Sequence, residues 1–283
     1  EEDATPAAAT CLTTNSTVCR ARVWQSSIGR LFKECQMTSI SIELVARDRG
    51  ELSGLIQEIH ERFPQIDTLN IPDLLRFPIR SWDAYQLGQP FFKNVIPHLR
   101  AMDFNLRGRF ELSEVLVKNN VKSILVITGD KPQDMSRKVY RNSSLELIRV
   151  IRKELPEINV YAGIDPYRAS LQKELDYVRD KLEAGAYGFF TQPFFDYRLL
   201  DIYAEQLEGV PVFWGICPVT SDKSKSYWES KNEAMFPKNF DLAYDNNVKL
   251  AQGILRRAKE TKSNVYFMPI RIDPIRYLKD VFA

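Results

Sequence analysis

The order of apolar segments along the chain constrains the fold more than any other feature. Eight short runs rich in β-branched and aromatic residues alternate with amphipathic stretches in which apolar residues recur three and four positions apart. The runs span 39–46, 67–71, 95–100, 123–129, 159–165, 187–193, 211–217 and 264–270, and the amphipathic stretches span 50–62, 109–119, 143–155, 170–184, 197–208 and 245–261. This alternation predicts a parallel sheet whose strands are connected by helices.

Eight strands favour a closed (β/α)8 barrel, which uses roughly 250 residues, over an open doubly wound sheet. An open dinucleotide-binding sheet begins with a Gly-rich turn, and this chain of 283 residues has none. We therefore predict an N-terminal arm at 1–36, with a short helical period at 23–32, and one barrel domain at 37–283. The connections 72–94 and 218–244 lack a clear period, so we expect a short or displaced helix in the first.

Charge balance and cysteine positions narrow the range of partners. Lys and Arg total 39 against 37 Asp and Glu, so nucleic acid and anionic membranes are not expected partners. No apolar stretch approaches the ~20 residues that span a bilayer, and residues 1–30 lack a signal-peptide pattern, which predicts a cytoplasmic protein.

Cys11, Cys19 and Cys35 cluster near the N-terminus, but their spacing fits no zinc-ligand pair and no His accompanies them. We predict no metal site.

Polar residues at the carboxyl ends of the predicted strands indicate a small-molecule site, because α/β barrels bind ligands at that end. The segment 191–196 is the most informative: the amide of Gln192 follows a buried strand, and Phe195 lies close behind it. In the first run, period-two alternation turns Glu43 into the barrel. Burial there would raise its pKa and suit it to proton donation, and an ion pair with an interior Arg or Lys is an equal alternative.

Three further candidates lie at the ends of the third and fourth runs. Asp130 follows Thr128 and Gly129, a position that suits either the catalytic rim of a barrel or an ordinary turn. His98 suits either proton exchange or cofactor contact, and a structural hydrogen bond is the common alternative for a lone His.

The fifth run and the helix after it supply the remaining candidates. Tyr161 and Asp165 mark the two ends of the run, where a ring and a carboxylate could serve a ligand or could pack and cap. Glu174 and Lys181 lie seven residues apart on similar sides of one predicted helix. Without further information, a solvated helix face is the expectation for this pair.

Taken in order, these residues resemble the methylenetetrahydrofolate reductase family, which are flavoproteins on an eight-stranded α/β barrel. The resemblance extends from residue 39 to about residue 220. The matching pieces are 41–43, 97–99, 129–132, Tyr161, Lys181 with 183–186, 191–196 and 215–219.

The resemblance implies reduction of 5,10-methylenetetrahydrofolate to 5-methyltetrahydrofolate by a protein that binds FAD and takes electrons from NADH or NADPH. It implies that Glu43 is the general acid, that Asp130 lies beside the flavin and the substrate, and that Gln192 and Phe195 contact the substrate. The FAD contacts that it implies are His98, Thr128, Tyr161, Asp165, Glu174 and Lys181. Its implied partners are a folate substrate and either a second copy of the chain or a partner subunit.

Three positions depart from the pattern of that family. A Gly-rich turn after the second strand is replaced by Asn70-Ile71-Pro72-Asp73, an Arg before Gly129 by Thr128, and a His after the fifth strand by Asp165. The last two changes remove positive charge where the FAD diphosphate would lie. Two other hypotheses therefore stay open: a flavin-free folate-binding barrel that serves as a subunit of a one-carbon complex, and a barrel lyase that uses Glu43 and Asp130.

Overall fold

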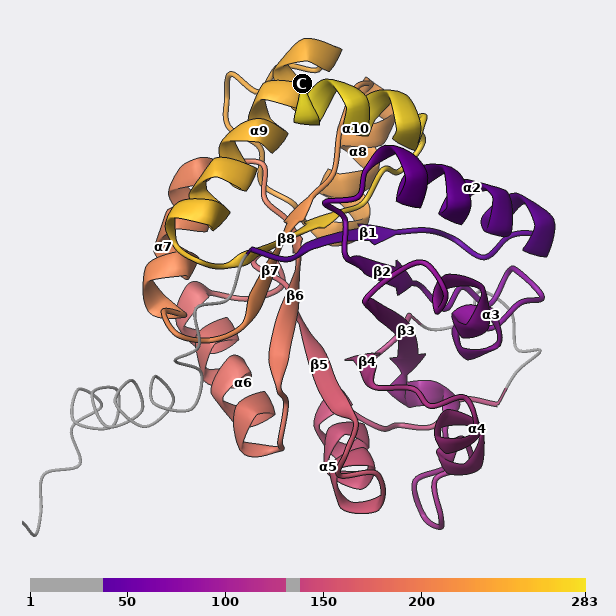
Figure 1. Ribbon diagram of the computed structural model, residues 1–283. Helices are drawn as coiled ribbons and strands as arrows, with labels where there is room; N and C mark the ends of the chain where they lie inside the picture. The colour runs from indigo at the N-terminus through magenta and orange to yellow at the C-terminus, as the bar shows by residue number, and fades with distance from the viewer. Residues whose placement is uncertain (1–37, 131–137) are drawn as a thin grey trace, which may run out of the picture.

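The computed structural model describes residues 38–130 and 138–283, so the predicted N-terminal arm and its three cysteines lie outside the described residues. Eight parallel strands follow one another around a closed barrel in chain order, and β8 pairs with β1 to complete it. The helices surround the strands (Figure 1). The predicted (β/α)8 barrel is therefore confirmed. None of the helices in the described part of the chain has the length and apolar character that a membrane crossing demands.

Each of the eight strands falls on one of the predicted runs. Several end one to three residues early, because the last residues of those runs leave the sheet and enter the loops at the carboxyl end of the barrel. The strands are β1 (Ile40–Glu43), β2 (Thr68–Ile71), β3 (Asn94–Arg100), β4 (Ser123–Ile127), β5 (Asn159–Ile164), β6 (Gly188–Pro193), β7 (Val212–Ile216) and β8 (Asn264–Phe267).

The helices follow the predicted amphipathic stretches, with two additions. The connection 72–94 holds the short helix that we expected, α3, and α4 is shorter than predicted. The helices are α2 (Arg49–Arg62), α3 (Ser81–Gly88), the 3-10 turn η1 (Ala101–Asp103), α4 (Ser113–Lys118), α5 (Ser144–Glu154), α6 (Leu171–Glu183), α7 (Tyr197–Gln206), α8 (Asp222–Asn232), α9 (Tyr244–Glu260) and α10 (Pro274–Phe282).

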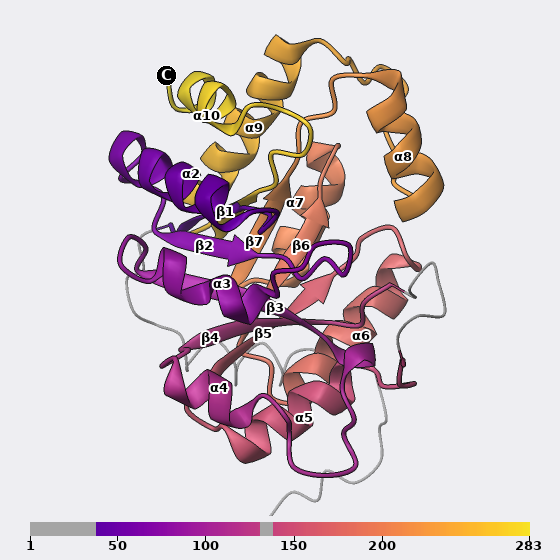
Figure 2. The same cartoon turned by 90° about the vertical axis from the view of Figure 1, so that its right-hand side faces the viewer.

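The two helices that the sequence pattern did not predict differ in kind. Helix α8 lies in the connection 218–244 and buries only Ser224 and Trp228, so it has no apolar stripe to detect. Figure 2 shows α8 outside the ring of the other helices, on the side toward which β6 points. Helix α10 carries ordinary signals: Asp273 caps its N-terminus, and Pro274 occupies the first helical position.

Two apolar layers result from the alternation of side chains along the strands. Ile40 and Ile42 pack outward into the core shared with the helices, as the period-two pattern predicts. A second cluster fills the barrel and continues beyond its carboxyl end to α8. It consists of Ile96, Leu125, Phe190, Phe195, Phe213, Cys217, Val219, Trp228, Ala234, Tyr266 and Met268. Glu43, one position beyond Ile42, therefore faces this inner layer.

Candidate active site

Glu43 lies at the carboxyl end of β1, partly buried against the inner apolar layer. The Tyr266 hydroxyl of β8 donates a hydrogen bond to its Oε2 atom. Burial raises the pKa of Glu43 to about 7, and the hydrogen bond from Tyr266 opposes this rise by stabilising the carboxylate. None of the ion pairs between described residues includes Glu43. Within that part of the chain, desolvation rather than an interior cation sets its protonation.

A buried hydrogen-bonded chain lies next to Glu43 and crosses three strands. His98 Nε2 lies 3.0 Å from Asn70 Oδ1, and Asn70 Nδ2 donates to Ser41 Oγ at 2.6 Å. An amide oxygen only accepts, so the hydrogen-bond pattern places the ring proton of His98 on Nε2. Burial lowers the pKa of His98 to about 3, which keeps the imidazole neutral. This geometry favours the structural hydrogen bond over proton exchange.

The ends of β6 and β7 are pressed together beside Gln192. The Gly215 backbone N–H donates to Thr191 Oγ1 at 2.8 Å, and a Cβ atom on Gly215 would lie only 2.6 Å from the Thr191 carbonyl oxygen and 2.8 Å from that of Gln192. Only Gly permits this approach. Gln192 is partly buried and lies near the carboxyl end of β6, in the stretch between Phe190 and Pro193 where the register against β7 shifts.

Phe195 lies within a cluster of rings rather than on the surface. It stacks on Phe236 with ring centroids 4.3 Å apart, and Trp228 of α8 meets it edge to face at 5.7 Å. Only 2% of Phe195 is exposed. The structure therefore makes Phe195 a support for Phe236 and α8 at this end of the barrel.

The rim after β4 presents Thr128 and Asp130, both exposed. The backbone between them turns through Gly129 at φ 88°, and the Arg100 side chain of β3 packs against this turn. Arg100 donates from Nη2 to the Asp130 carbonyl oxygen, while its Nε atom is buried without a hydrogen-bond acceptor among the described residues. The Asp130 backbone is thus anchored and its carboxylate stays exposed at the rim.

Glu174 and Lys181 of α6 form a buried charge cluster, so the expectation of a solvated helix face is wrong. Lys181 Nζ lies 3.7 Å from Glu174 Oε1 and donates to the Gly163 carbonyl oxygen at 2.6 Å. Arg168 donates to Glu174 Oε2, and the Asp165 backbone N–H donates to Glu174 Oε1 at 3.1 Å. Burial lowers the pKa of Lys181 to about 8, and the Glu174 charge limits the fall.

Tyr161 and Asp165 lie at different depths of the barrel. The Tyr161 ring packs inside it, edge to face with Tyr187, Phe190 and Phe213 at centroid distances of 5.4, 5.2 and 5.8 Å. Asp165 lies just beyond β5, where its Oδ1 atom accepts from the Tyr167 backbone N–H at 3.0 Å and burial raises its pKa. Asp165 is therefore at the rim, and Tyr161 is a packing residue below it.

The predicted residues fall into separate groups around one end of the barrel. Glu43 and His98 lie with β1, β2, β3 and β8, whereas Asp165, Glu174 and Lys181 gather at β5 and α6. Among the described residues, no group of three or more His, Cys, Asp or Glu side chains could hold a metal ion. The functional groups that the described residues offer at this end of the barrel are carboxylates, amides, cations and aromatic rings.

Sequence reasoning missed three residues of these groups: Tyr266, Arg100 and Phe236. A usable signal existed for Tyr266, because alternation in the last strand turns Asn264, Tyr266 and Met268 inward, and closure of a barrel brings that strand against the first. Arg100 and Phe236 had no such signal, since their partners come from other loops.

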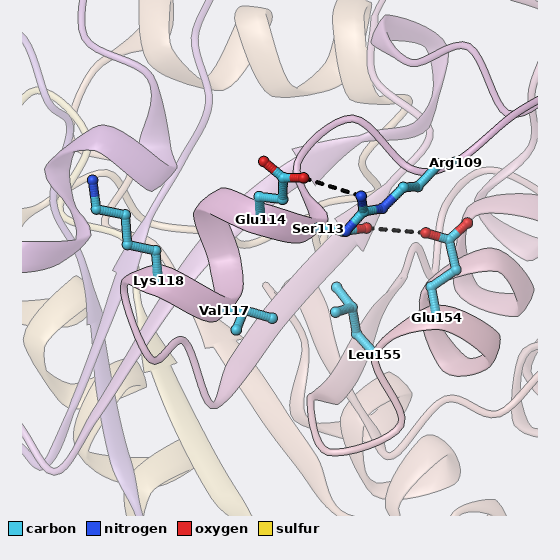
Figure 3. A pocket seen from close by; sticks show the side chains of 7 residues that line it. All are labelled: Arg109, Ser113, Glu114, Val117, Lys118, Glu154 and Leu155. Carbon is cyan, nitrogen blue, oxygen red and sulfur yellow. Dashed lines mark hydrogen bonds and ion pairs between the residues drawn. The ribbon is translucent and has the colours of Figure 1, made fainter.

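A hollow of about 580 Å³ lies on the outer surface between α4 and the end of α5 (Figure 3). Its polar side chains pair with one another: Arg109 Nη1 lies 3.0 Å from Glu114 Oε1, and Ser113 Oγ donates to Glu154 Oε2 at 3.0 Å. The Glu154 carboxylate also accepts from the Phe110 backbone N–H. The contacts of Glu154 join α5 to α4 and to the loop before it, and the hollow contains none of the predicted site residues.

Comparison with solved structures supports the fold. The chain matches 2,3-dimethylmalate lyase, described as a member of the PEP mutase/isocitrate lyase superfamily, with a TM-score of 0.55 and 12% identity over 87% of this chain and 79% of the other. It matches oxaloacetate acetylhydrolase with a TM-score of 0.54 and 11% identity over 90% and 93% of the two chains. At such identities the likeness concerns the barrel architecture alone.

Comparison with curated sequences gives a family. The 5,10-methylenetetrahydrofolate reductase of Buchnera aphidicola subsp. Schizaphis graminum is 24% identical over 147 residues, which is 50% of each chain. That of Pectobacterium carotovorum subsp. carotovorum is 23% identical over 154 residues, 53% of this chain and 52% of the relative. The chain thus spans about half the length of the curated relatives it matches.

The model of the methylenetetrahydrofolate reductase family matches residues 84–252, more than half of the chain. The matched region holds β3 to β7, and with them His98, Asp130 and Gln192; Glu43 of β1 and Tyr266 of β8 lie outside it. With the barrel fold, this match shows that the chain belongs to the methylenetetrahydrofolate reductase family.

Proposed function

We propose that this chain is a flavin oxidoreductase that reduces 5,10-methylenetetrahydrofolate to 5-methyltetrahydrofolate. The observation that carries the proposal is Glu43, a carboxyl group at the carboxyl end of β1 whose pKa burial raises to about 7. An acid whose pKa lies near the working pH can both hold a proton and release it. Glu43 donates this proton to the folate amine as the folate ring opens to the reactive iminium.

The residues at the carboxyl end of the barrel fit an FAD. An anionic diphosphate needs guanidinium or ammonium donors. Arg100 offers a buried guanidinium whose Nε atom makes no hydrogen bond to a described residue and lies 3.8 Å from Asp103 Oδ2. The Arg168 side chain is 46% exposed and pairs with Glu174. These two cations compensate for Thr128 and Asp165 at the positions where the family carries Arg and His. A bound FAD would supply the hydride chemistry between NADH or NADPH and the folate.

The residues proposed to hold this cofactor are His98, Thr128, Asp165, Glu174 and Lys181, whereas Tyr161 packs below them inside the barrel. Within this set, Lys181 already donates to the Gly163 carbonyl oxygen and neighbours Glu174. We therefore assign Lys181 and Glu174 the task of holding Arg168, which presents its charge to the phosphates. Neutral His98 presents an uncharged ring surface, consistent with its lowered pKa.

Two side chains are assigned to the substrate and its reaction. Gln192, fixed by the close approach of β6 to Gly215, hydrogen-bonds the pterin or the nicotinamide amide. Asp130, whose backbone is anchored by Arg100, places a carboxylate near the flavin and the pterin and tunes both electrostatically. Phe195 supports the ring surface on which the substrate lies.

The test is spectroscopic first and kinetic second. We expect the isolated protein, or the protein reconstituted with FAD, to show flavin absorbance. Glu43→Gln is expected to abolish folate reduction and to leave flavin reduction by NADH or NADPH largely intact, because only folate reduction needs the acid. Glu58→Gln, which alters an exposed carboxylate on α2, is the matched control and should preserve both half-reactions.

A protein that stays colourless and cannot be reconstituted with FAD would contradict the proposal. If that protein still binds a reduced folate, the flavin-free folate-binding barrel becomes the better hypothesis. Loss of both half-reactions in Glu43→Gln, or of neither, would contradict the role given to the acid.

A further inference from the structure

The Glu43 carboxyl has one hydrogen-bond partner among the described residues, and it comes from the far end of the sequence. Closure of the barrel pairs β1 with β8 and sets Ser41 opposite Tyr266. Two residues further along β1, Glu43 Oε2 accepts the proton of the Tyr266 hydroxyl. The contact joins residues 223 positions apart and exists only because the barrel closes.

Packing of its ring fixes the direction of the Tyr266 hydroxyl. Tyr266 is 4% exposed, and its ring meets Phe190 edge to face at a centroid distance of 5.1 Å. Phe190 in turn stacks on Phe213 at 4.2 Å, so three strands hold the ring in place. A ring confined in this way cannot swing its hydroxyl away from Glu43 without opening the inner layer.

The hydrogen bond also decides where the carboxyl carries its proton. Burial and the neighbouring Glu43 charge raise the pKa of Tyr266 well above its ordinary value, so the phenol keeps its proton, and in the structure it donates that proton to Glu43 Oε2. Glu43 Oε2 is then occupied as an acceptor. With Tyr266 donating to Oε2, the proton of a neutral Glu43 carboxyl sits on Oε1, the oxygen that Tyr266 does not contact.

We propose that Tyr266 is a positioning residue that orients the Glu43 carboxyl and confines its acidic proton to Oε1. The proposal rests on the proposed function insofar as Glu43 is the acid of the reaction. It concerns two residues that both lie outside the region matched by the family model.

The groups that face Glu43 are few, which makes its titration interpretable. Strand β8 contributes the Tyr266 hydroxyl, and the loop after β7 contributes the Cys217 thiol, whose pKa burial raises to about 12. Strand β2 places the neutral amide of Asn70 opposite Glu43. In the described part of the chain, Tyr266 is therefore the partner whose removal changes the environment of the carboxyl.

The first measurement needs no cofactor or substrate. An infrared difference titration follows the protonated carboxyl band of Glu43, identified by its absence in Glu43→Gln. In Tyr266→Phe, we expect the midpoint of this band to move to higher pH, because the hydrogen bond that stabilises the carboxylate is lost. The matched control is Tyr277→Phe, which removes a buried hydroxyl with no hydrogen-bond partner in the described structure and should leave the midpoint unchanged.

The second measurement uses the FAD-loaded enzyme. Folate reduction needs protonated Glu43, so its rate falls as the pH rises through the pKa of that group. In Tyr266→Phe, this descending limb is expected to shift to higher pH. The plateau rate is expected to fall by about tenfold or more, because the carboxyl is no longer held in one orientation toward the substrate. Flavin reduction by NADH or NADPH should stay within about twofold of the unmodified protein, and Tyr277→Phe should match it in both half-reactions.

The outcomes separate this inference from the proposed function. An unchanged carboxyl midpoint in Tyr266→Phe overturns the positioning role, whatever the enzyme does. A shifted midpoint in a protein without folate reduction supports the contact and contradicts the proposed function. Should Tyr266→Phe fail to fold, the ultraviolet difference spectrum of the unmodified chain replaces it: a tyrosine signal that follows the carboxyl titration and vanishes in Glu43→Gln supports the contact, and its persistence there overturns it.

Discussion

At the scale of single residues, the barrel holds ionisable groups in states that they would not adopt in water. Burial raises the pKa of Glu43 and lowers that of His98, and both are stabilised by one neutral partner rather than by an opposite charge. Lys181 keeps a paired charge through Glu174. Such displaced pKa values favour function at Glu43 but oppose stability, because the charged form has lost its water.

Burial of the Glu43 carboxyl, which disfavours its charged form, makes the stability of the protein depend on pH. The folded-state pKa of about 7 exceeds the ordinary value of 4.5, so between these limits the unfolded state loses its proton first and stability falls as the pH rises. We expect Glu43→Gln, which cannot ionise, to match the unmodified protein near pH 4 and to exceed it by up to about 3 kcal/mol near pH 8. Urea unfolding at both pH values measures the difference.

The exposed carboxylate of Glu58 supplies the control for that experiment. Glu58→Gln should change the free energy of unfolding by less than about 0.5 kcal/mol at either pH, because Glu58 makes a solvent-exposed ion pair with Arg62. A Glu43→Gln variant whose advantage is the same at both pH values would contradict the raised pKa.

At the scale of elements, the contact between β6 and β7 decides where Gln192 can lie. The register of this pair shifts between Phe190 and Pro193, and the backbones approach so closely at Gly215 that no side chain fits. The irregularity and the glycine belong together, since a regular ladder would separate the strands by the ordinary sheet spacing. The end of β6 that carries the Gln192 amide is therefore positioned by a neighbouring residue that has no side chain.

Gly215→Ala is expected to destabilise the protein by about 2 kcal/mol or more, because the new Cβ atom would collide with the backbone of Thr191 and Gln192. The matched control is Gly54→Ala on the exposed side of α2, where a Cβ atom meets nothing within 4 Å. That variant should stabilise the protein by about 0.5 to 1 kcal/mol, the usual gain from Ala over Gly in a helix. Urea unfolding of the two variants should give shifts of opposite sign, and shifts of the same sign would contradict the argument.

At the scale of the whole molecule, the pairing of β8 with β1 closes the barrel and brings the first and last strands together. Because β1 pairs with both β2 and β8, the barrel has no open edge, and the first and last strands are neighbours in one sheet. Helix α10 packs beside α9 and reaches the end of α2 through Phe282 and Phe63. The carboxyl-terminal strand and helix are therefore part of the barrel wall.

A chain that begins at Met37 is expected to fold by itself, because it contains every strand of the closed barrel. Its thermal unfolding, followed by circular dichroism, should remain a single cooperative transition, and its folate reduction should match that of the full chain. A broad transition or a loss of activity would show that residues 1–36 contribute to the functional unit.

The sequence by itself determined the architecture and the inward direction of Glu43. Period-two and helical patterns predicted eight strands in order and most of the helices, because those patterns reflect which face of each element is buried. The same alternation directed Glu43 into the barrel. Helix α8 escaped prediction because its stability comes from Trp228 against Phe195, a tertiary contact, and not from an apolar stripe.

Only the tertiary structure decided which inward and rim-facing groups meet. The hydrogen bond from Tyr266 to Glu43, the approach of Arg100 to Asp130 and the burial of Lys181 with Glu174 depend on strand register, loop paths and helix docking. Local patterns along a chain encode burial, whereas pairing between distant residues is set when the sheet closes and the helices dock. The inward position of Glu43 could therefore be predicted from the sequence, and its hydrogen bond from Tyr266 could not.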